Sequence, residues 1–483
     1  MNVLRWILSL GAAFVFSLMS AAQEKGPPPL PKDLPAYGPL VPFRAPNTEI
    51  KKLKNGLTLW LVPRPGFPKA ALALAVRGGR AADPKDRPGL SDLLLATIDQ
   101  GSKTRSAKQL AEALQAAGGD LAGSPRADSL VLSTAILASK VDSALRILAD
   151  VAENATFPDN EVALAKRDAA DSLRAQEADS SFLAQRTLAR AMFGNHPYAV
   201  ISPTQESINQ ISPAELRAAY AQRFRPDQAL LVAVGDFQSE ELEASIEKNF
   251  GTWTAADDPP VSPVPVPAED NRHAIFLVPR PGSVQTTILL AGFGPTRRDP
   301  DYAATQVANA IYAGMFGSRL LRNIREDKGY SYSPGASLQL RTEAGIIRTR
   351  ADVRNDVTGP SLNEITYELN RMATTDPAPN EVSRAQRFLV GTNAIVLQVR
   401  GAVAGELATL WVDGLPPVAL GQENADIQKV SVQEAAAAGR KYFAAARQTI
   451  VTVGEEKVVR EQLAPFGLHI EPAADAASRA APE

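Results

Sequence analysis

The 483-residue sequence contains no cysteine and only three histidines, which excludes several kinds of active site at once. Without cysteine there is no disulfide bond, no thiolate metal ligand and no cysteine nucleophile. The net charge is only −2, so composition gives no reason to expect nucleic acid or an anionic membrane as a partner. The sequence also lacks a P-loop, a G-x-G-x-x-G element and a G-x-S-x-G element, so it does not indicate a nucleotide-binding protein or an α/β-hydrolase.

The three histidines are too far apart in sequence to form a local metal motif. His196 lies in the segment GNHPYA and is expected to pack in a loop, His273 begins a predicted strand, and His469 lies near the end of the fold. Asp168 and Asp171 share one helical stretch, where a solvated face is a better interpretation than a calcium site. No metal ligand set is therefore predicted in this chain.

The N-terminus has the pattern of a cleavable secretory signal. One arginine precedes the apolar stretch Trp6–Met19, and the small residues Ser20 to Ala22 follow it. We expect residues 1–22 to be a signal peptide and the protein to be exported, either periplasmic or secreted; an uncleaved membrane anchor is the alternative. The Pro-rich residues 23–44 are expected to form an extended lead-in.

An internal repeat divides the rest of the sequence. Three short matches recur at a constant offset of 216 positions: LVPRPG at 61 and 277, Asp-Pro at 83 and 299, and Gly-Ser at 101 and 317. We therefore expect two homologous halves, 45–256 and 272–470. The Pro-rich residues 257–271 should join them, and the small, polar residues 471–483 should form a disordered tail.

Apolar periodicity predicts an α+β fold, with strands in a meander packed on a layer of helices in each half. In the first half the predicted strands are Thr58–Val62, Ala71–Val76, Ser129–Leu137 and Gln228–Val234, and a long helical stretch covers Glu161–Met192. In the second half the predicted strands are Ala274–Val278, Thr286–Gly292, Tyr330–Leu340, Ile346–Val353 and Thr449–Val453.

The stretch Gly314–Ser333, GMFGSRLLRNIREDKGYSYS, reads as a helix that runs into a strand. Leu320, Leu321 and Ile324 form an apolar stripe, and Gly329 suits the left-handed residue that ends a helix. Arg325 and Tyr332 can then point at the same space across the corner. An arginine fork and a phenol can together polarise a carbonyl group. From these residues alone, a solvated helix face followed by an ordinary strand is the competing interpretation.

The pattern G-x-x-x-S-R-L…R-E-x-K-G-Y-x-Y-S resembles the C-terminal signature of the pitrilysin/insulinase family of zinc peptidases, the inverzincins. In that family an arginine and a tyrosine of the C-terminal half reach the zinc site of the N-terminal half. The resemblance carries these roles to Arg325 and Tyr332.

The family's zinc motif, H-x-x-E-H, is absent where the resemblance would place it. Gly89-Leu90-Ser91 matches the residues that precede the motif, but the three essential positions hold Asp92, Leu95 and Ala96. The family's later glutamate should fall near Asp171–Leu173, which contains none. The same positions of the second half hold Ala308, Ile311 and Tyr312, and the first half has Gln109 and Ala116 where the second has the Arg/Tyr pair.

The resemblance therefore implies the non-zinc-binding subunit of a heteromeric metallopeptidase. A homologous partner bearing H-x-x-E-H would hold the zinc, and this chain, inactive alone, would bind the peptide substrate through Arg325 and stabilise the oxyanion through Tyr332. The substrate would add as a strand to a sheet edge. The segment Gly118–Ser124 resembles the family's glycine-containing edge, and its role here would be structural or peptide-guiding only. The alternative is a catalytically silent peptide-binding or scaffold homologue, similar to the core subunits of respiratory complexes.

Overall fold

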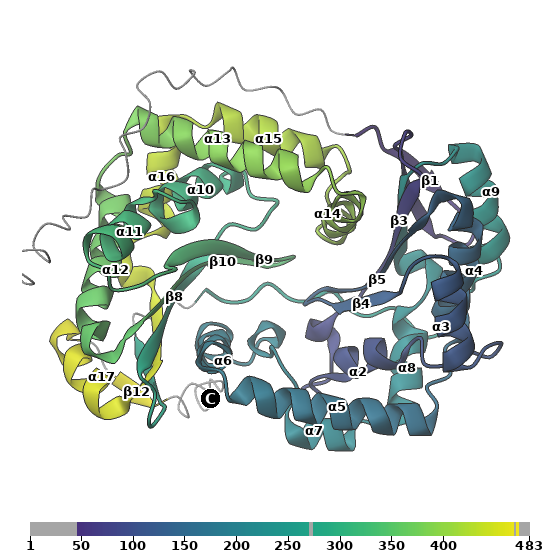
Figure 1. The fold of residues 1–483 in the computed structure, drawn as a ribbon, viewed down its shortest axis with the longest axis horizontal. Helices are drawn as coiled ribbons and strands as arrows, with labels where there is room; N and C mark the ends of the chain where they lie inside the picture. Colours follow the sequence, from purple (N-terminus) through teal and green to yellow (C-terminus); the bar gives the residue numbers. More distant parts are fainter. Residues whose placement is uncertain (1–45, 270–273, 468–469, 473–483) are drawn as a thin grey trace, which may run out of the picture. The chain divides into compact units, whose positions relative to one another are not determined.

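The computed structural model describes residues 46–269, 274–467 and 470–472, all within one structural unit. The predicted signal peptide and residues 23–44 lie outside these ranges, as do His273, His469 and residues 473–483 of the predicted tail. The fold is α+β, as predicted, with two six-stranded sheets (Figure 1). The first sheet has the order β1-β2-β6-β3-β5-β4 and consists of β1 (Glu49–Lys52), β2 (Thr58–Pro63), β3 (Lys69–Arg77), β4 (Ala122–Pro125), β5 (Ser129–Leu137) and β6 (Ala229–Gly235).

The second sheet repeats this arrangement in the second half of the chain. Its order is β12-β7-β11-β8-β10-β9. Its strands are β7 (Ile275–Pro279), β8 (Gln285–Gly294), β9 (Gly335–Arg341), β10 (Ala344–Arg354), β11 (Thr449–Gly454) and β12 (Ile470–Pro472). The order and pairing directions from β2 to β4 are the same as those from β7 to β9, which supports an internal duplication. The remaining edge strands differ, because β1 is antiparallel to β2 whereas β12, the last described strand, is parallel to β7. β12 also contains residues 471 and 472, so the predicted start of a disordered tail at Glu471 is wrong by two residues.

The predicted meander is wrong in both sheets. β6 pairs in parallel with β2 and antiparallel with β3, and β11 lies in the same way between β7 and β8. All seven residues of β6 are buried, and a strand that is apolar on both faces is stable only in the middle of a covered sheet. The gain from burying β6 therefore places it between β2 and β3, although β2 and β3 are neighbours in sequence and would pair with each other in a meander.

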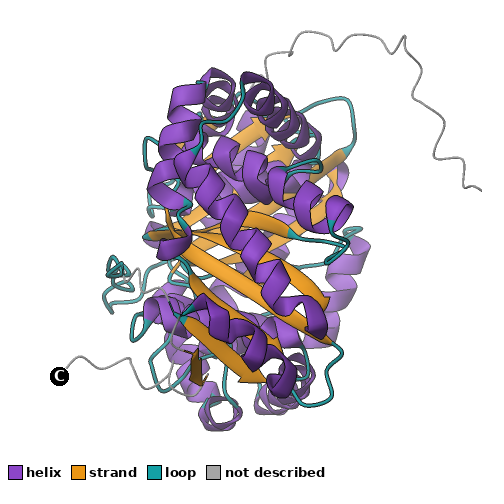
Figure 2. Cartoon of the chain, turned by 90° about the vertical axis from the view of Figure 1, so that its left-hand side faces the viewer, coloured by secondary structure: helices purple, strands orange, loops and turns teal. Residues whose placement is uncertain are grey.

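Helices lie against the strands in both halves (Figure 2). The first half contains α2 (Leu90–Thr97), α3 (Ala107–Ala116), α4 (Val141–Asn154), α5 (Asp159–Glu177), α6 (Ser180–Phe193), α7 (Gln205–Gln210), α8 (Pro213–Arg223) and α9 (Ser239–Phe250). The second half contains α10 (Tyr302–Asn309), α11 (Arg319–Leu321), α12 (Thr358–Thr374), α13 (Pro379–Val396), α14 (Arg400–Val412), α15 (Ala419–Lys429), α16 (Val432–Tyr442) and α17 (Glu456–Leu463). Within the described ranges, no single helix is both long and apolar enough to cross a membrane.

The helical stretch predicted over Glu161–Met192 is two helices. Asp179 separates α5 from α6, and its carboxylate accepts hydrogen bonds from the backbone N–H groups of Ser181 (2.6 Å) and Phe182 (3.2 Å). This is the N-cap arrangement that begins a helix. The break matters because α5 packs on α2 and α7 of the first half, whereas α6 packs on β8 and β11 of the second sheet.

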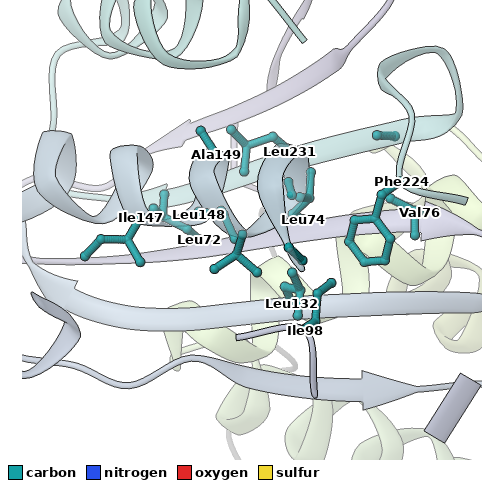
Figure 3. Close-up of a cluster of buried hydrophobic side chains, with 14 of the residues drawn as sticks. Leu72, Leu74, Val76, Ile98, Leu132, Ile147, Leu148, Ala149, Phe224 and Leu231 are labelled. Atoms are coloured by element: carbon teal, nitrogen blue, oxygen red, sulfur yellow. The ribbon is translucent and has the colours of Figure 1, made fainter. Parts of the chain in front are cut away.

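One face of each sheet is covered by helices of the same half. In the first half, Leu72, Leu74 and Val76 of β3 point into a core that also contains Leu145 and Leu148 of α4 (Figure 3). Helices α10, α12, α16 and α17 contribute to the equivalent core on the second sheet. In these two cores, each sheet is covered by helices from its own half, as in an ordinary α+β domain.

The other face of each sheet is covered by a helix of the opposite half. Helix α14 packs on β3 and β6 of the first sheet, and α6 packs on β8 and β11 of the second. Ala73 and Ala75 of β3 face α14, so β3 presents alanines on this face and the leucines Leu72 and Leu74 on the other. This exchange explains why β6 and the seven residues of β3 between Lys69 and Arg77 are all apolar and buried instead of alternating.

Arg77, at the end of β3, fixes the C-terminal end of α14. Its guanidinium donates hydrogen bonds to the carbonyl oxygens of Trp411 (2.9 Å) and Val412 (3.0 Å), and it lies over the Trp411 ring, 4.4 Å from the centroid. The last carbonyls of a helix have no partner within the helix and carry partial negative charge. Arg77 therefore satisfies the end of the exchanged helix from the opposite half.

Two carboxylates, Asp128 and Asp413, accept further hydrogen bonds where the two halves meet. Asp128 accepts hydrogen bonds from the Tyr198 hydroxyl (2.7 Å) and from the backbone N–H of Thr342 (2.9 Å) in the other half. The Thr342 hydroxyl donates to Asp413 at 3.2 Å. Burial, together with the nearby Asp128 charge, raises the pKa of Asp413 to about 6 even though Arg297 and Thr342 oppose the shift.

Replacing Arg77 by alanine should lower the free energy of unfolding by about 2 kcal/mol, because two charge-assisted hydrogen bonds and a cation–π contact are lost. The shift of the urea midpoint measures this loss. Arg174→Ala is the matched control, because Arg174 makes only an exposed pair with Asp171 on α5. It should cost less than about 0.5 kcal/mol. Equal midpoints for the two variants would contradict the role given to Arg77.

Asp413→Asn should stabilise the protein at pH 8 by about 1 to 2 kcal/mol and have little effect at pH 4. Between the unfolded pKa of 3.8 and the folded pKa of about 6, the folded state still holds a proton that the unfolded state has lost. Raising the pH through this window therefore destabilises the wild type, and the asparagine variant escapes the loss. Unfolding midpoints at the two pH values test this, and an equal difference at both would contradict it.

Candidate functional site

Arg325 lies on a π-helical turn that the sequence does not predict. Three residues of α11 are followed by η6 (Arg322–Asp327), whose backbone adopts the wider i→i+5 pattern. Such turns are rare and often occur at functional sites. The predicted apolar stripe is confirmed, because Leu320, Leu321 and Ile324 are all buried beneath the turn. Arg325 projects from the partly exposed side.

Ion pairs and hydrogen bonds fix the buried side of this segment to the helices behind it. The Arg319 guanidinium donates to both carboxylate oxygens of Glu381 on α13, at 2.7 and 2.8 Å. Asn323 donates to Glu368 on α12 at 3.1 Å. All four groups are buried or partly buried, so the segment cannot shift without breaking charge-assisted bonds. The backbone that carries Arg325 is therefore rigidly supported.

Gly329 reverses the chain after the π-helical turn. Its φ of 65° is the left-handed conformation that the sequence predicts for this position. The backbone N–H groups of Tyr330 (2.8 Å) and Ser331 (3.2 Å) then both donate to the carbonyl oxygen of Ile324. The helix end is thus satisfied by the segment that follows it.

Tyr332 lies in a loop and not in a strand. The predicted strand over Tyr330–Leu340 begins only at Gly335, because the preceding residues are engaged with the helix end and with β10. Ser331 is buried, and its hydroxyl donates to the carbonyl oxygen of Asp352 at 2.9 Å. This bond fixes the loop to the sheet. Tyr332 follows it with its side chain 81% exposed.

The structure brings Arg325 and Tyr332 together. The Arg325 Cζ atom lies over the Tyr332 ring, 4.8 Å from its centroid, and also over the Phe316 ring at 5.3 Å. Phe316 is 70% exposed, so all three side chains form one accessible cluster. Among the described residues, neither the guanidinium nor the Tyr332 hydroxyl makes a hydrogen bond or an ion pair. Their donors are free to bind an acceptor from solution.

The positions of the zinc motif have a different character. Asp92 on α2 accepts hydrogen bonds from Arg80 Nη2 (2.6 Å) and Nε (3.0 Å) and is thereby neutralised. Leu95 is buried, Ala96 is exposed, and neither has a donor atom for a metal. A zinc site needs three or four such donors, so this set does not fit zinc.

The other positions considered for metal binding are also structural. Asp171 pairs with Arg174 on the exposed side of α5, and Leu173 is buried. In the second half, the corresponding positions Ala308, Ile311 and Tyr312 are buried in the core. In the parts of the chain that the structure describes, no three His, Cys, Asp or Glu side chains gather closely enough to hold a metal ion.

His196 has the packing role that the sequence predicts. Its Nε2 atom lies 2.8 Å from the carbonyl oxygen of Pro265, and its Nδ1 atom accepts a hydrogen bond from the backbone N–H of Tyr198. Both ring nitrogens are therefore occupied. Asp168 and Asp171 are exposed on α5, as expected for a solvated face.

The segment Gly118–Ser124 leads into β4, an edge strand. β4 pairs with β5 on one side only, so its other side is open to a further strand. Gly123 of β4 lies against α2, where an added Cβ atom would come within 3.2 Å of Leu95 Cβ. The edge thus runs over the helix that carries the degenerate zinc positions.

Phe316 is the functional candidate that the sequence analysis missed. The sequence signal is modest: a phenylalanine between Gly314 and Gly317, just before the polar helix face. Nothing in that pattern shows that its ring meets Arg325, because the contact depends on the turn at Gly317 and on the π-helical geometry.

Two family models match this chain. The model described as insulinase (peptidase family M16) matches residues 61–202, and the model described as peptidase M16 inactive domain matches residues 210–389. An uncharacterized zinc protease of Rickettsia bellii is 24% identical over 362 residues, covering 74% of this chain and 86% of the relative. A protein of Helicobacter pylori named non-peptidase homolog YmxG is 23% identical over 342 residues, covering 68% and 76%.

A solved structure agrees with these matches. A peptidase M16 inactive domain from Pseudomonas fluorescens superposes with a TM-score of 0.79 at 25% identity, covering 84% of this chain and 98% of that one. The matched ranges include the degenerate zinc positions and the Arg325/Tyr332 cluster, each in the half where the sequence analysis expects it. This chain therefore belongs to the insulinase/pitrilysin family, peptidase family M16.

Proposed function

We propose that this chain is the non-zinc-binding subunit of a heteromeric metallopeptidase, inactive alone and completed by a homologous subunit that bears H-x-x-E-H. The observation that carries the proposal is the contrast between its two halves. Arg325 and Tyr332 adjoin each other at the surface with unengaged donors, whereas the zinc positions hold an ion pair, a buried leucine and an alanine.

The unengaged donors suit a peptide carbonyl group. The guanidinium presents a planar fork of N–H groups, and the phenol presents one O–H that can rotate to its acceptor. Arg325 would hold the substrate backbone, and Tyr332 would donate to the oxygen on which negative charge develops during hydrolysis. The partner's zinc would supply the activated water.

The buried residues that hold Arg325 and Tyr332 in position favour a catalytic role for the pair over simple peptide binding. Arg319, six residues before Arg325, and Ser331, directly before Tyr332, are both buried and bonded to neighbouring elements. A transition-state donor must already be in position when charge forms, because reorganisation at that moment raises the barrier. The rigid support of this segment meets that requirement.

The substrate would reach the pair as an added strand. An extended peptide can pair with an open sheet edge, gaining backbone hydrogen bonds without sequence selectivity. The edge strand β4, which the segment Gly118–Ser124 enters, would guide the peptide. The signal-like residues 1–22 further support export, so the complex would act in the periplasm or outside the cell.

A second candidate is a catalytically silent peptide-binding or scaffold homologue. The relative named non-peptidase homolog favours it, as does the description of the matched second-half model as an inactive domain. The two candidates differ in one measurable property: only the first requires Arg325 and Tyr332 to change the rate of peptide hydrolysis by a zinc-bearing partner.

Tyr332→Phe should lower kcat of the two-subunit complex by about 100-fold with little change in KM, because a donor to the developing oxyanion is lost. The complex is the tagged chain with its co-purified zinc-bearing partner, assayed on a library of quenched fluorescent peptides. Tyr367→Phe is the matched control, since Tyr367 is an exposed tyrosine of α12. A Tyr332→Phe complex as active as this control would rule out the oxyanion role.

Arg325→Ala should lower kcat/KM by at least 100-fold, and Arg325→Lys should restore only part of it, because lysine keeps the charge and loses the fork. Arg322→Ala, an exposed arginine on the same π-helical turn, should remain near wild type. Thermal midpoints should be unchanged in all three, since neither arginine is buried. Wild-type rates for Arg325→Ala would favour the scaffold function instead.

A further inference from the structure

Phe316 is an exposed aromatic residue that the fold holds in a fixed position. The backbone N–H of Ser318 donates to the carbonyl oxygen of Met315 at 3.1 Å, and Gly317 has a φ of 76°. A positive φ at the third residue of such a turn is typical of type II geometry, with Phe316 at the corner. Met315 and Ser318 are both buried, so the turn is anchored on each side of the ring.

The exposure of Phe316 has no compensation within the described fold. A phenylalanine gains stability by burial, and this ring is 70% exposed although its neighbour Met315 is in the core. Its one described ring contact is with Arg325, whose Cζ lies 5.3 Å from the centroid. The ring thus presents an apolar surface directly beside the free donors of the Arg/Tyr pair.

The chemistry of this cluster identifies its ligand. A guanidinium and a phenol with free donors call for a carbonyl or carboxylate oxygen, and two exposed rings call for an apolar or aromatic group attached close to it. A peptide residue with an aromatic side chain offers both within a few bonds. A small inorganic anion offers only the first.

We propose that Phe316 is a specificity-determining residue that contacts an aromatic side chain of the peptide next to the carbonyl held by Arg325 and Tyr332. This inference rests on the proposed function and deepens it. Phe316 also limits the rotation of Arg325 by lying under its guanidinium, so the ring acts both on selectivity and on positioning.

The test compares peptides that differ only by Phe or Ala at one position, scanned over the three residues on each side of the cleaved bond. In the two-subunit complex, the wild type should prefer phenylalanine at one position by about tenfold or more in kcat/KM. Phe316→Ala should reduce this preference to about twofold, mainly by raising KM for the aromatic peptide. Phe316→Leu should be intermediate.

Phe67→Ala is the matched control. Phe67 is a similarly exposed phenylalanine, 52% exposed, whose ring lies 5.2 Å from the Cζ atom of Arg400, outside the Arg/Tyr cluster. This variant should keep the full aromatic preference. If Phe316→Ala also keeps it, or if Phe316→Ala weakens subunit association in sedimentation instead, the specificity role is overturned.

A second measurement separates this inference from the proposed function. The full chain without its partner is titrated into fluorescein-labelled peptides of the same Phe/Ala pairs, and fluorescence anisotropy gives the ratio of dissociation constants. A ratio of about tenfold that Phe316→Ala abolishes supports the inference even if no cleavage occurs with a partner. Losses of activity in Arg325→Ala and Tyr332→Phe, with no change in the ratio for Phe316→Ala, would uphold the function and overturn the inference.

Discussion

The fold depends on the covering of two apolar sheet faces by exchanged helices. Each half supplies enough helices for one face of its own sheet, and the opposite half supplies α14 or α6 for the other. Neither half can therefore bury its central strands alone, because β6 is apolar on both faces. The halves are therefore held together by the packing of α6 and α14 as well as by the linker. Removing either of these helices would expose a continuous apolar surface to water. This mutual dependence makes the duplicated chain one unit.

In the segment that carries the candidate site, the residues that stabilise the fold differ from those that form the site. On the segment that carries the candidate site, Leu320, Ile324 and Arg319 face inward and account for its anchoring, whereas Arg325 and Tyr332 face solvent and make no polar bond among the described residues. The anchoring residues offset the cost of keeping two rings exposed. Substitutions at the exposed positions therefore report on function with little effect on folding.

Much of the fold could be predicted from the sequence, and the parts that could not be predicted all depend on contacts between residues far apart in the chain. The duplication, the strands at Thr58–Val62 and Ser129–Leu137 and the left-handed Gly329 follow from local pattern and repeat register. The central position of β6 and the helix exchange depend on contacts between residues far apart in the chain, which periodicity does not encode. An apolar run without alternation was the available signal for strands covered on both faces.

The candidate site was predictable in part for the same reason. A family resemblance names Arg325 and Tyr332, and seven-residue spacing across a turn makes their contact plausible. Sequence does not reveal that the turn is π-helical or that Tyr332 lies in a loop, since both depend on Ser331 and Ile324 sharing bonds across the segment. The contact of Phe316 with Arg325 depends on the turn at Gly317, which the sequence pattern does not predict.

The former zinc positions of the first half and the Arg/Tyr cluster of the second half are not equivalent positions of the duplication, and they differ in how their polar groups are satisfied. In the first half, Asp92 is neutralised by Arg80 and Leu95 packs beneath Gly123, so the one charged group at the former metal positions has a partner within the fold. In the second half, the Arg325 guanidinium and the Tyr332 hydroxyl have ring contacts but no hydrogen bond or ion pair to any described residue. Buried polar groups of folded proteins nearly always have a hydrogen-bond partner, whereas exposed polar groups can be hydrated or can bind a ligand. The exposed cluster of Arg325, Tyr332 and Phe316 is therefore the surface to which our proposal assigns a ligand.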